Sequence, residues 1–182
     1  MERHSPDPNP AAAPAADAVA ADLARLVLLS ETLSAWVEEV EVGGADPFDL
    51  LPLCQVVREY AYGALLPALR STIGPHLLAT GVLASLPPEH GPGEDPELAG
   101  ALAWLGSTAD ASEILLATKS LDRALSARVQ REHVVIEAHR ELREGDRVAL
   151  ARRMDHAHPE VSDGRGAVDR LLDRMDWPGR AA

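Results

Sequence analysis

The sequence contains few aromatic residues and almost no cysteine. Aromatic residues account for 3% of the chain, whereas apolar residues, mainly Ala, Leu and Val, account for 46%. Cys54 is the single cysteine, which excludes an internal disulfide and a cysteine-based zinc cluster and is typical of a reducing compartment. We therefore expect a cytoplasmic protein that folds around an apolar core without covalent cross-links.

Long uninterrupted apolar runs are also missing. Residues 1–14 are polar and proline-rich, without the apolar core of a secretory signal. The most apolar early stretch, Leu23–Val40, contains four charged residues, so it cannot span a bilayer, which requires about 20 predominantly apolar residues. The sequence thus predicts neither export nor a membrane partner.

No motif of a common enzyme class occurs. The glycines form neither a phosphate-binding loop nor a dinucleotide-binding fingerprint, and no serine lies in a Gly-x-Ser-x-Gly elbow. Cys54 lies in an apolar helical pattern with only Arg58 nearby, which favours packing over reactivity. The sequence therefore favours a non-enzymatic protein, with an enzyme of an unrecognised all-helical class as an alternative.

Basic residues are scarce in the first two-thirds of the chain. Residues 1–118 contain four arginines against 17 acidic residues, residues 119–182 contain 13 basic and 12 acidic residues, and the formal net charge is −12. This charge argues against direct nucleic-acid binding, which depends on Lys and Arg. The acidic residues form either a solubilising surface or a face for a basic partner, such as a DNA-binding protein or a cationic toxin.

What the sequence does contain is helical periodicity along most of its length. Apolar residues recur at spacings of three and four over residues 19–40, interrupted by Ser30. A second apolar face covers residues 50–69, with a kink expected at Pro67, because proline lacks a backbone N–H and clashes with the preceding turn. No useful alternating run predicts a strand. We expect an all-α, single-domain antiparallel bundle of five to seven helices.

Capping residues, prolines and glycines predict the boundaries. The bundle domain is expected over residues 17–177, between a disordered Pro- and Ala-rich leader (1–16) and a disordered tail (178–182). Asp17 is an expected N-cap, and so is Asp46, which precedes Pro47, with Asp49 as the alternative; Asp95-Pro96 is expected to begin another helix. We further expect a short helix after Pro75 through Leu86 and a helix that ends at Gly106. A long helix should end at Glu144, followed by a stop at Gly145-Asp146 and a helix over Arg147–Ala157. The chain should then form a loop over His158–Gly166 and a last helix over Ala167–Asp176.

The long helix carries polar residues within its apolar arc. Arg128, Glu132 and His139 project into that arc, and Arg128 and Glu132 are four residues apart, so they can pair directly. Unsatisfied polar groups in a core cost free energy. The three residues therefore predict an internal paired network, an interface with another chain such as a homodimer, or a functional site.

Four of the seven histidines lie between residues 131 and 158. His133, His139 and His156 are candidate ligands for a divalent metal, zinc or nickel, held across the turn between two helices. Neither His-Glu-x-x-His nor Glu-x-x-His occurs in this stretch, which disfavours a metalloprotease-type zinc helix or a di-iron bundle.

Part of this stretch resembles the last two helices of the effector domain in FadR-type members of the GntR family of transcriptional regulators. The matching residues are Glu132-His133, Ile136, Gly145-Asp146, Ala149, Met154 and then His156 or His158. The resemblance covers residues 132–158, and no winged-helix DNA-binding domain accompanies it. It implies a helical bundle whose interior holds a divalent metal, bound by one Asp and three His, that receives a small carboxylate. By this resemblance His133 and either His156 or His158 would be metal ligands.

These features predict a small cytoplasmic, non-enzymatic helical protein that acts as a regulatory or protein-interaction module. Its acidic first two-thirds would face a basic protein partner. The alternative is a ligand- or metal-sensing helical domain related to transcriptional-regulator effector domains. No cofactor is expected other than such a divalent metal.

Overall fold

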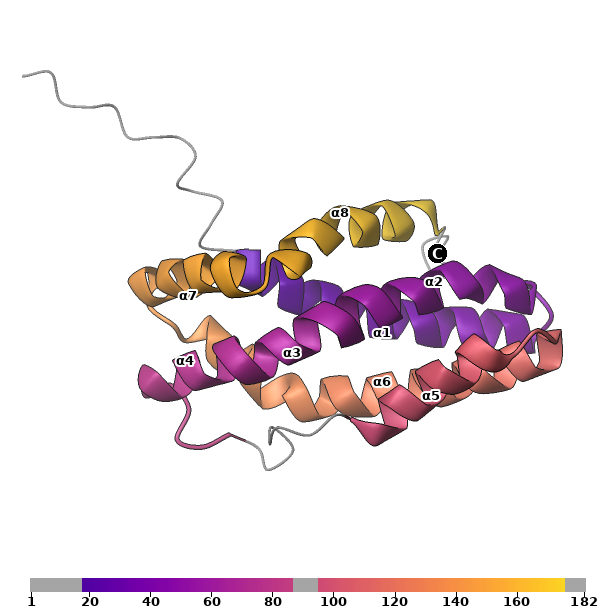
Figure 1. Ribbon diagram of the computed structural model, residues 1–182, viewed down its shortest axis with the longest axis horizontal. Coiled ribbons are helices and arrows are strands. Elements are labelled where there is room, and N and C mark those ends of the chain that lie inside the picture. Colours follow the sequence, from indigo (N-terminus) through magenta and orange to yellow (C-terminus); the bar gives the residue numbers. More distant parts are fainter. Residues whose placement is uncertain (1–17, 87–94, 176–182) are drawn as a thin grey trace, which may run out of the picture.

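The computed structural model describes residues 18–86 and 95–175, which form an all-α, single-domain helical bundle (Figure 1). If the uninterrupted helical path Leu51–Ala79 is counted as one, the described residues form six long helices and no strand. The predicted fold class and number of helices are confirmed. The predicted leader, the tail and the Asp17 cap lie outside the described residues.

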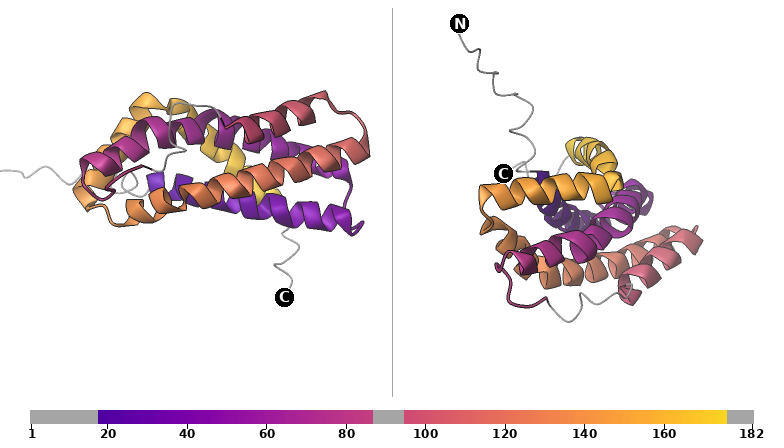
Figure 2. Two further views of the ribbon diagram at one scale, coloured as in Figure 1. Left: turned by 90° about the horizontal axis from the view of Figure 1, so that it is seen from below. Right: turned by 60° about the vertical axis from the view of Figure 1, so that its left-hand side comes forward.

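Four helical runs alternate in direction across the bundle (Figure 1). They are α1 (Ala18–Glu41), the path from α2 (Leu51–Val56) to α4 (Gly74–Ala79), α5 (Pro96–Ser107) and α6 (Ala111–Arg140). A short 3₁₀ helix, η2 (Pro47–Leu50), precedes α2. The last two helices, α7 (Glu144–Ala157) and α8 (Pro159–Arg174), then pack over α1 and the α2–α4 path (Figure 2).

The apolar seam of α1 packs mainly against α6 of the same chain. Every seam residue predicted over residues 19–40 is buried, and Ser30, the polar interruption, has its Oγ 3.1 Å from Ser126 Oγ on α6. The predicted apolar face over residues 50–69 is buried as well. The α1 seam is therefore covered by helices of the same chain.

The path from α2 to α4 accommodates two prolines by widening the helix. Two π-helical stretches, η3 (Val57–Leu65) and η4 (Leu69–Ile73), flank the short α3 (Leu66–Ala68), and each ends two residues before a proline. The Leu66 N–H donates to the carbonyl of Ala61, five residues back, just ahead of Pro67. At Pro67, where the sequence predicted a kink, the helical path continues between these two π-helical stretches.

Three predicted boundaries near glycine or proline are wrong. The helix does not restart at Pro75 and reach Leu86; it continues through Gly74 and ends at Ala79. The long helix ends at Arg140, and Gly145 lies inside α7 instead of marking a stop. There the buried Leu142 lies in the turn, and its N–H donates to the carbonyl of His139. Core packing of Leu142, rather than glycine, places the break.

The loop expected over His158–Gly166 is instead the first half of α8. Glycine is a poor helix former, but a Cβ on Gly164 would lie 2.7 Å from the Tyr60 ring. The missing side chain allows α8 to approach η3 closely. Tertiary packing thus outweighs the low helix propensity of the segment.

Candidate functional site

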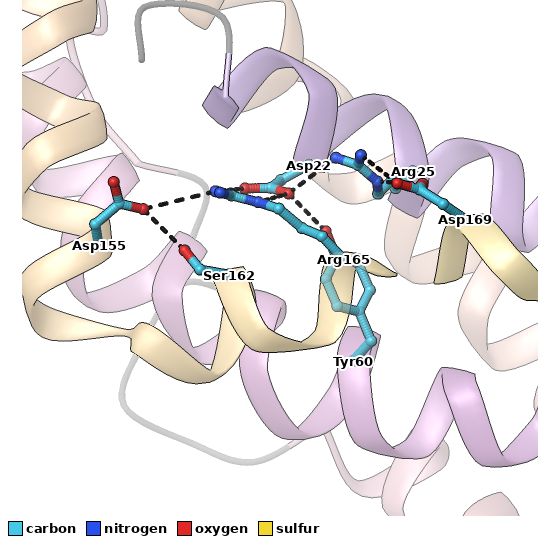
Figure 3. Close-up of polar contacts among 7 residues, drawn as sticks. All are labelled: Asp22, Arg25, Tyr60, Asp155, Ser162, Arg165 and Asp169. Atoms are coloured by element: carbon cyan, nitrogen blue, oxygen red, sulfur yellow. Dashed lines mark hydrogen bonds and ion pairs between the residues drawn. The ribbon is translucent and has the colours of Figure 1, made fainter. Parts of the chain in front are cut away.

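A buried carboxylate at the start of α1 connects three parts of the bundle (Figure 3). Asp22 is fully buried and accepts two hydrogen bonds from Arg165 of α8, at 2.8 and 2.6 Å. Tyr60 of η3 donates to it at 2.8 Å, and Arg25 of α1 donates at 3.3 Å. All of these groups donate hydrogen bonds to the carboxylate, and the two arginines also carry the positive charge that compensates it.

The two arginines extend this network toward the surface (Figure 3). Arg25 forms a two-pronged pair with Asp169 of α8, with hydrogen bonds of 2.8 and 2.9 Å. The hydrogen bond from Arg25 lowers the pKa of Asp169. Burial, followed by the Asp22 charge, raises the pKa of Tyr60, so its hydroxyl keeps its proton and remains a donor. The arrangement is suited to holding α1, η3 and α8 together.

The sequence predictions did not include the Asp22 network. The signal was present in part, because Asp22 lies three residues after Val19 and four before Leu26, on the core-facing side of α1. Its partner Arg165 is 143 residues away, within a segment expected to be a loop. Spacing along the chain could have marked Asp22 as a buried acid, but not identified its partner.

The predicted polar group on α6 is buried. Arg128 and Glu132 pair with each other, and Asp95, the N-cap of α5, lies 3.8 Å from Arg128 and 2.7 Å from Arg131. The carboxylate of Asp95 also accepts from the Leu98 N–H at 3.1 Å. Burial lowers the pKa of Arg128, while Glu132 opposes that shift. The network joins α5 to α6 and supports the first of the three interpretations, an internal pairing.

His139 is buried as predicted, but it does not meet the other candidate ligands in a metal site. His133 and His156 are exposed, whereas His139 lines a groove of about 210 Å³ between α1 and α6. Within residues 18–86 and 95–175, no group of three or more His, Cys, Asp or Glu side chains could hold a metal ion. The structure therefore does not bring His133, His139 and His156 together around a divalent metal.

His158 makes contacts with a different set of residues. Its Nε2 is 3.0 Å from the hydroxyl oxygens of both Ser71 and Thr72, and its Nδ1 is 3.3 Å from Glu160. A Ser–His–Glu order also occurs in hydrolytic triads. Here, however, the Ser71 hydroxyl donates to the Pro67 carbonyl at 2.9 Å, and Thr72 contacts the same imidazole nitrogen. We interpret these contacts as an anchor that holds the α7–α8 junction on η4.

A cavity of about 360 Å³ lies between η3 and α8, beside Tyr60. The acidic residues Glu59, Glu160 and Asp163 line it, together with small and apolar residues. No basic residue is among its lining residues. The lining of this cavity is therefore acidic, like the chain as a whole.

One end of the bundle combines acidic and apolar side chains. The α1–α2 and α5–α6 connections lie together at the right-hand end in Figure 1, and η2 packs on α6. Residues 38–51 and 104–119, which form this end, contain seven acidic residues and one basic residue. The basic residue, Lys119, pairs with Glu41. Most of the negative charge at this end therefore has no basic residue of the same segments to balance it.

Comparison with protein-family models, curated proteins and solved structures gives no match. The resemblance of residues 132–158 to a regulator effector domain thus stays a prediction. Among the described helices, none combines the length and apolar character needed to cross a membrane.

Proposed function

We propose that the chain is a non-enzymatic protein-interaction module of the cytoplasm that binds a basic protein partner through its acidic first two-thirds. The observation that carries this proposal is the uneven use of charge. Arginines from the last third pair with buried acids, Arg165 with Asp22 and Arg131 with Asp95. The acids at the α1–α2 end have only Lys119 among them.

This distribution favours recognition of positive charge. Because Arg128 is buried and the half-buried Arg165 is paired with Asp22, neither arginine compensates the negative charge of the exposed acids. Complementary charge accelerates association and selects partners more than it adds affinity. A basic protein partner is therefore a better fit than an acidic one or a nucleic acid.

Two further observations support binding over catalysis. Burial raises the pKa of the Cys54 thiol to about 11, so at neutral pH this cysteine is not a thiolate nucleophile. The candidate histidines are distributed over separate places: His133 and His156 are on the surface, and His139 is in the α1–α6 groove.

The test is capture of proteins from an extract of the source cells on the immobilised chain at low and high ionic strength. We expect basic proteins to be retained at low salt and released at high salt. The double variant Glu38→Lys, Glu113→Lys should lose them, because both acids are exposed at the acidic end.

The matched control is the double variant Glu141→Lys, Asp173→Lys, which changes the net charge equally at exposed positions of the last third. It should retain the same proteins as the parent chain. If both double variants behave alike, or if no basic protein is retained, the acidic first two-thirds are not the binding surface.

A further inference from the structure

Exposed apolar side chains concentrate at the acidic end of the bundle. Among the described residues, seven large apolar side chains are exposed, and five of them belong to the segments that meet at this end. These five, called the apolar end patch, are Val42 (80% exposed), Phe48 (47%), Leu51 (37%), Trp104 (42%) and Leu116 (54%). Exposed apolar side chains gathered in one region of a surface mark interaction sites more often than scattered ones do.

Local structure holds part of the apolar end patch in place. Phe48, the only phenylalanine of the chain, lies in η2. The Asp46 carboxylate accepts from the Phe48 N–H at 2.9 Å, and the Asp49 carboxylate accepts from the Asp46 N–H at 3.3 Å, which closes a capping box. Hydrogen bonds thus fix the turn that carries Phe48, so the exposure of Phe48 does not result from a loosely held segment.

The segments that carry the apolar end patch also contribute seven acidic residues: Glu38, Glu39, Glu41, Asp46, Asp49, Asp110 and Glu113. Lys119 neutralises Glu41, and Arg58, on the adjacent η3, donates to the Leu102 carbonyl of α5. An apolar surface on such acidic segments repels a second copy of itself and attracts an apolar surface that is accompanied by basic residues.

We propose that the apolar end patch is a docking surface for a basic amphipathic helix of a protein partner. Such a helix places apolar residues on one face and lysines or arginines beside them, which matches both properties of this end. The inference rests on the proposed function and deepens it by naming the surface and the chemistry of the partner. Exposed aromatic residues such as Phe48 and Trp104 are typical anchors for this kind of contact.

The test uses a labelled synthetic peptide with leucines on one helical face and lysines on the other, followed by fluorescence anisotropy. We expect Phe48→Ser and Leu116→Ser each to weaken peptide binding about ten-fold, because each removes an apolar anchor. Val134→Ser is the matched control, because Val134 is 45% exposed and lies on α6 like Leu116. It follows Leu116 by 18 residues, or about five turns, and therefore lies on the same side of α6. It should bind the peptide like the parent chain.

The outcomes separate this inference from the proposed function. If the three serine variants bind equally well and Glu38→Lys, Glu113→Lys binds weakly, the acidic surface still binds a basic partner, but the apolar end patch is not the docking surface. If the parent chain fails to bind the peptide at low salt but still retains basic proteins from the extract, only this inference fails; if it binds neither, both proposals fail. If sedimentation shows that the chain alone self-associates and Leu116→Ser abolishes this, a second copy occupies the patch and the inference is overturned.

Discussion

Cys54 illustrates how a single residue is shaped by its surroundings. Its side chain is buried on the inner face of α2, with Sγ 3.7 Å from the Thr118 hydroxyl of α6. Burial raises the pKa of its thiol to about 11, while the contact with Thr118 and the charge of Arg58 offset only part of that shift. The thiol is therefore neutral at physiological pH and behaves as a small apolar side chain.

The raised pKa of Cys54 predicts a loss of stability at alkaline pH. The unfolded chain ionises this thiol near its ordinary pKa of 9.0, whereas the folded chain does so near 11. The contribution of the protonated Cys54 thiol to the free energy of unfolding is thus complete below pH 9. It should fall by about 2 kcal/mol as the pH rises to 11. Urea unfolding of the parent chain and of Cys54→Ala measures it, because the variant lacks this ionisation.

Burial also raises the pKa of Tyr60, which adds a loss of stability of the same sign at alkaline pH, but Tyr60 is present in both proteins. The stability difference between the parent chain and Cys54→Ala should therefore shrink with rising pH. A difference that stays constant from pH 8 to pH 11 would show that the folded chain does not resist ionisation of Cys54.

At the scale of elements, glycine has different roles in two helices. Gly100 lies in the interior of α5, where a Cβ would meet nothing within 4 Å. Gly164 lies within α8, where a Cβ would be 2.7 Å from the ring of Tyr60. That ring is buried and held through its hydroxyl by Asp22, so it cannot move away easily.

Replacing each glycine with alanine separates helix propensity from packing. We expect Gly100→Ala to raise the free energy of unfolding by about 0.5–1 kcal/mol, because alanine loses less backbone entropy on folding. Gly164→Ala should lose this gain and destabilise the protein, because the added methyl clashes with Tyr60. Chemical denaturation of both variants measures the contrast; equal stabilisation would mean that α8 can shift away from η3.

Element boundaries show where local signals were sufficient. Asp46 and Asp95 begin their helices as predicted, since an N-cap followed by proline acts within a single turn. The break between α6 and α7 was misplaced at Gly145, because the burial of Leu142 depends on the rest of the core. The π-helical stretches before Pro67 and Pro75 were likewise not predicted beyond an expected irregularity at Pro67.

For the whole molecule, the Asp22 network is the main polar connection between the first helix and the last. Asp22→Asn should destabilise the protein by about 3–5 kcal/mol, because Arg165 loses the buried carboxylate with which it forms two hydrogen bonds. As a control, Glu137→Gln removes a carboxylate that pairs with Arg140 on the exposed side of α6 and should cost no more than about 0.5 kcal/mol.

Thermal or urea unfolding of both variants measures this prediction. The double variant Asp22→Asn, Arg165→Met should lose less than the sum of the two single variants, because the residues contact each other directly. Additive losses, or an effect of Asp22→Asn as small as that of Glu137→Gln, would mean that the carboxylate is not coupled to α8.

The candidate surface also emerges only in the whole molecule. An excess of acids in residues 1–118 is visible in the sequence and led to the expectation of a basic partner. That η2, which carries Phe48, packs on α6, which carries Leu116, is not visible there, because the two segments are far apart in the chain. Exposure of these side chains depends on how η2 and α5 sit on α6.

The sequence by itself determined the all-α class, the buried faces of α1 and α2, and the pairing of Arg128 with Glu132. These properties depend on a repeat of 3.6 residues and on neighbours one turn apart, so they are encoded locally. Only the tertiary structure decided that Arg165 reaches Asp22, that Gly164 continues a helix, and that the candidate histidines stay apart. Each of these depends on distances between segments far apart in the chain, which only packing of the core sets.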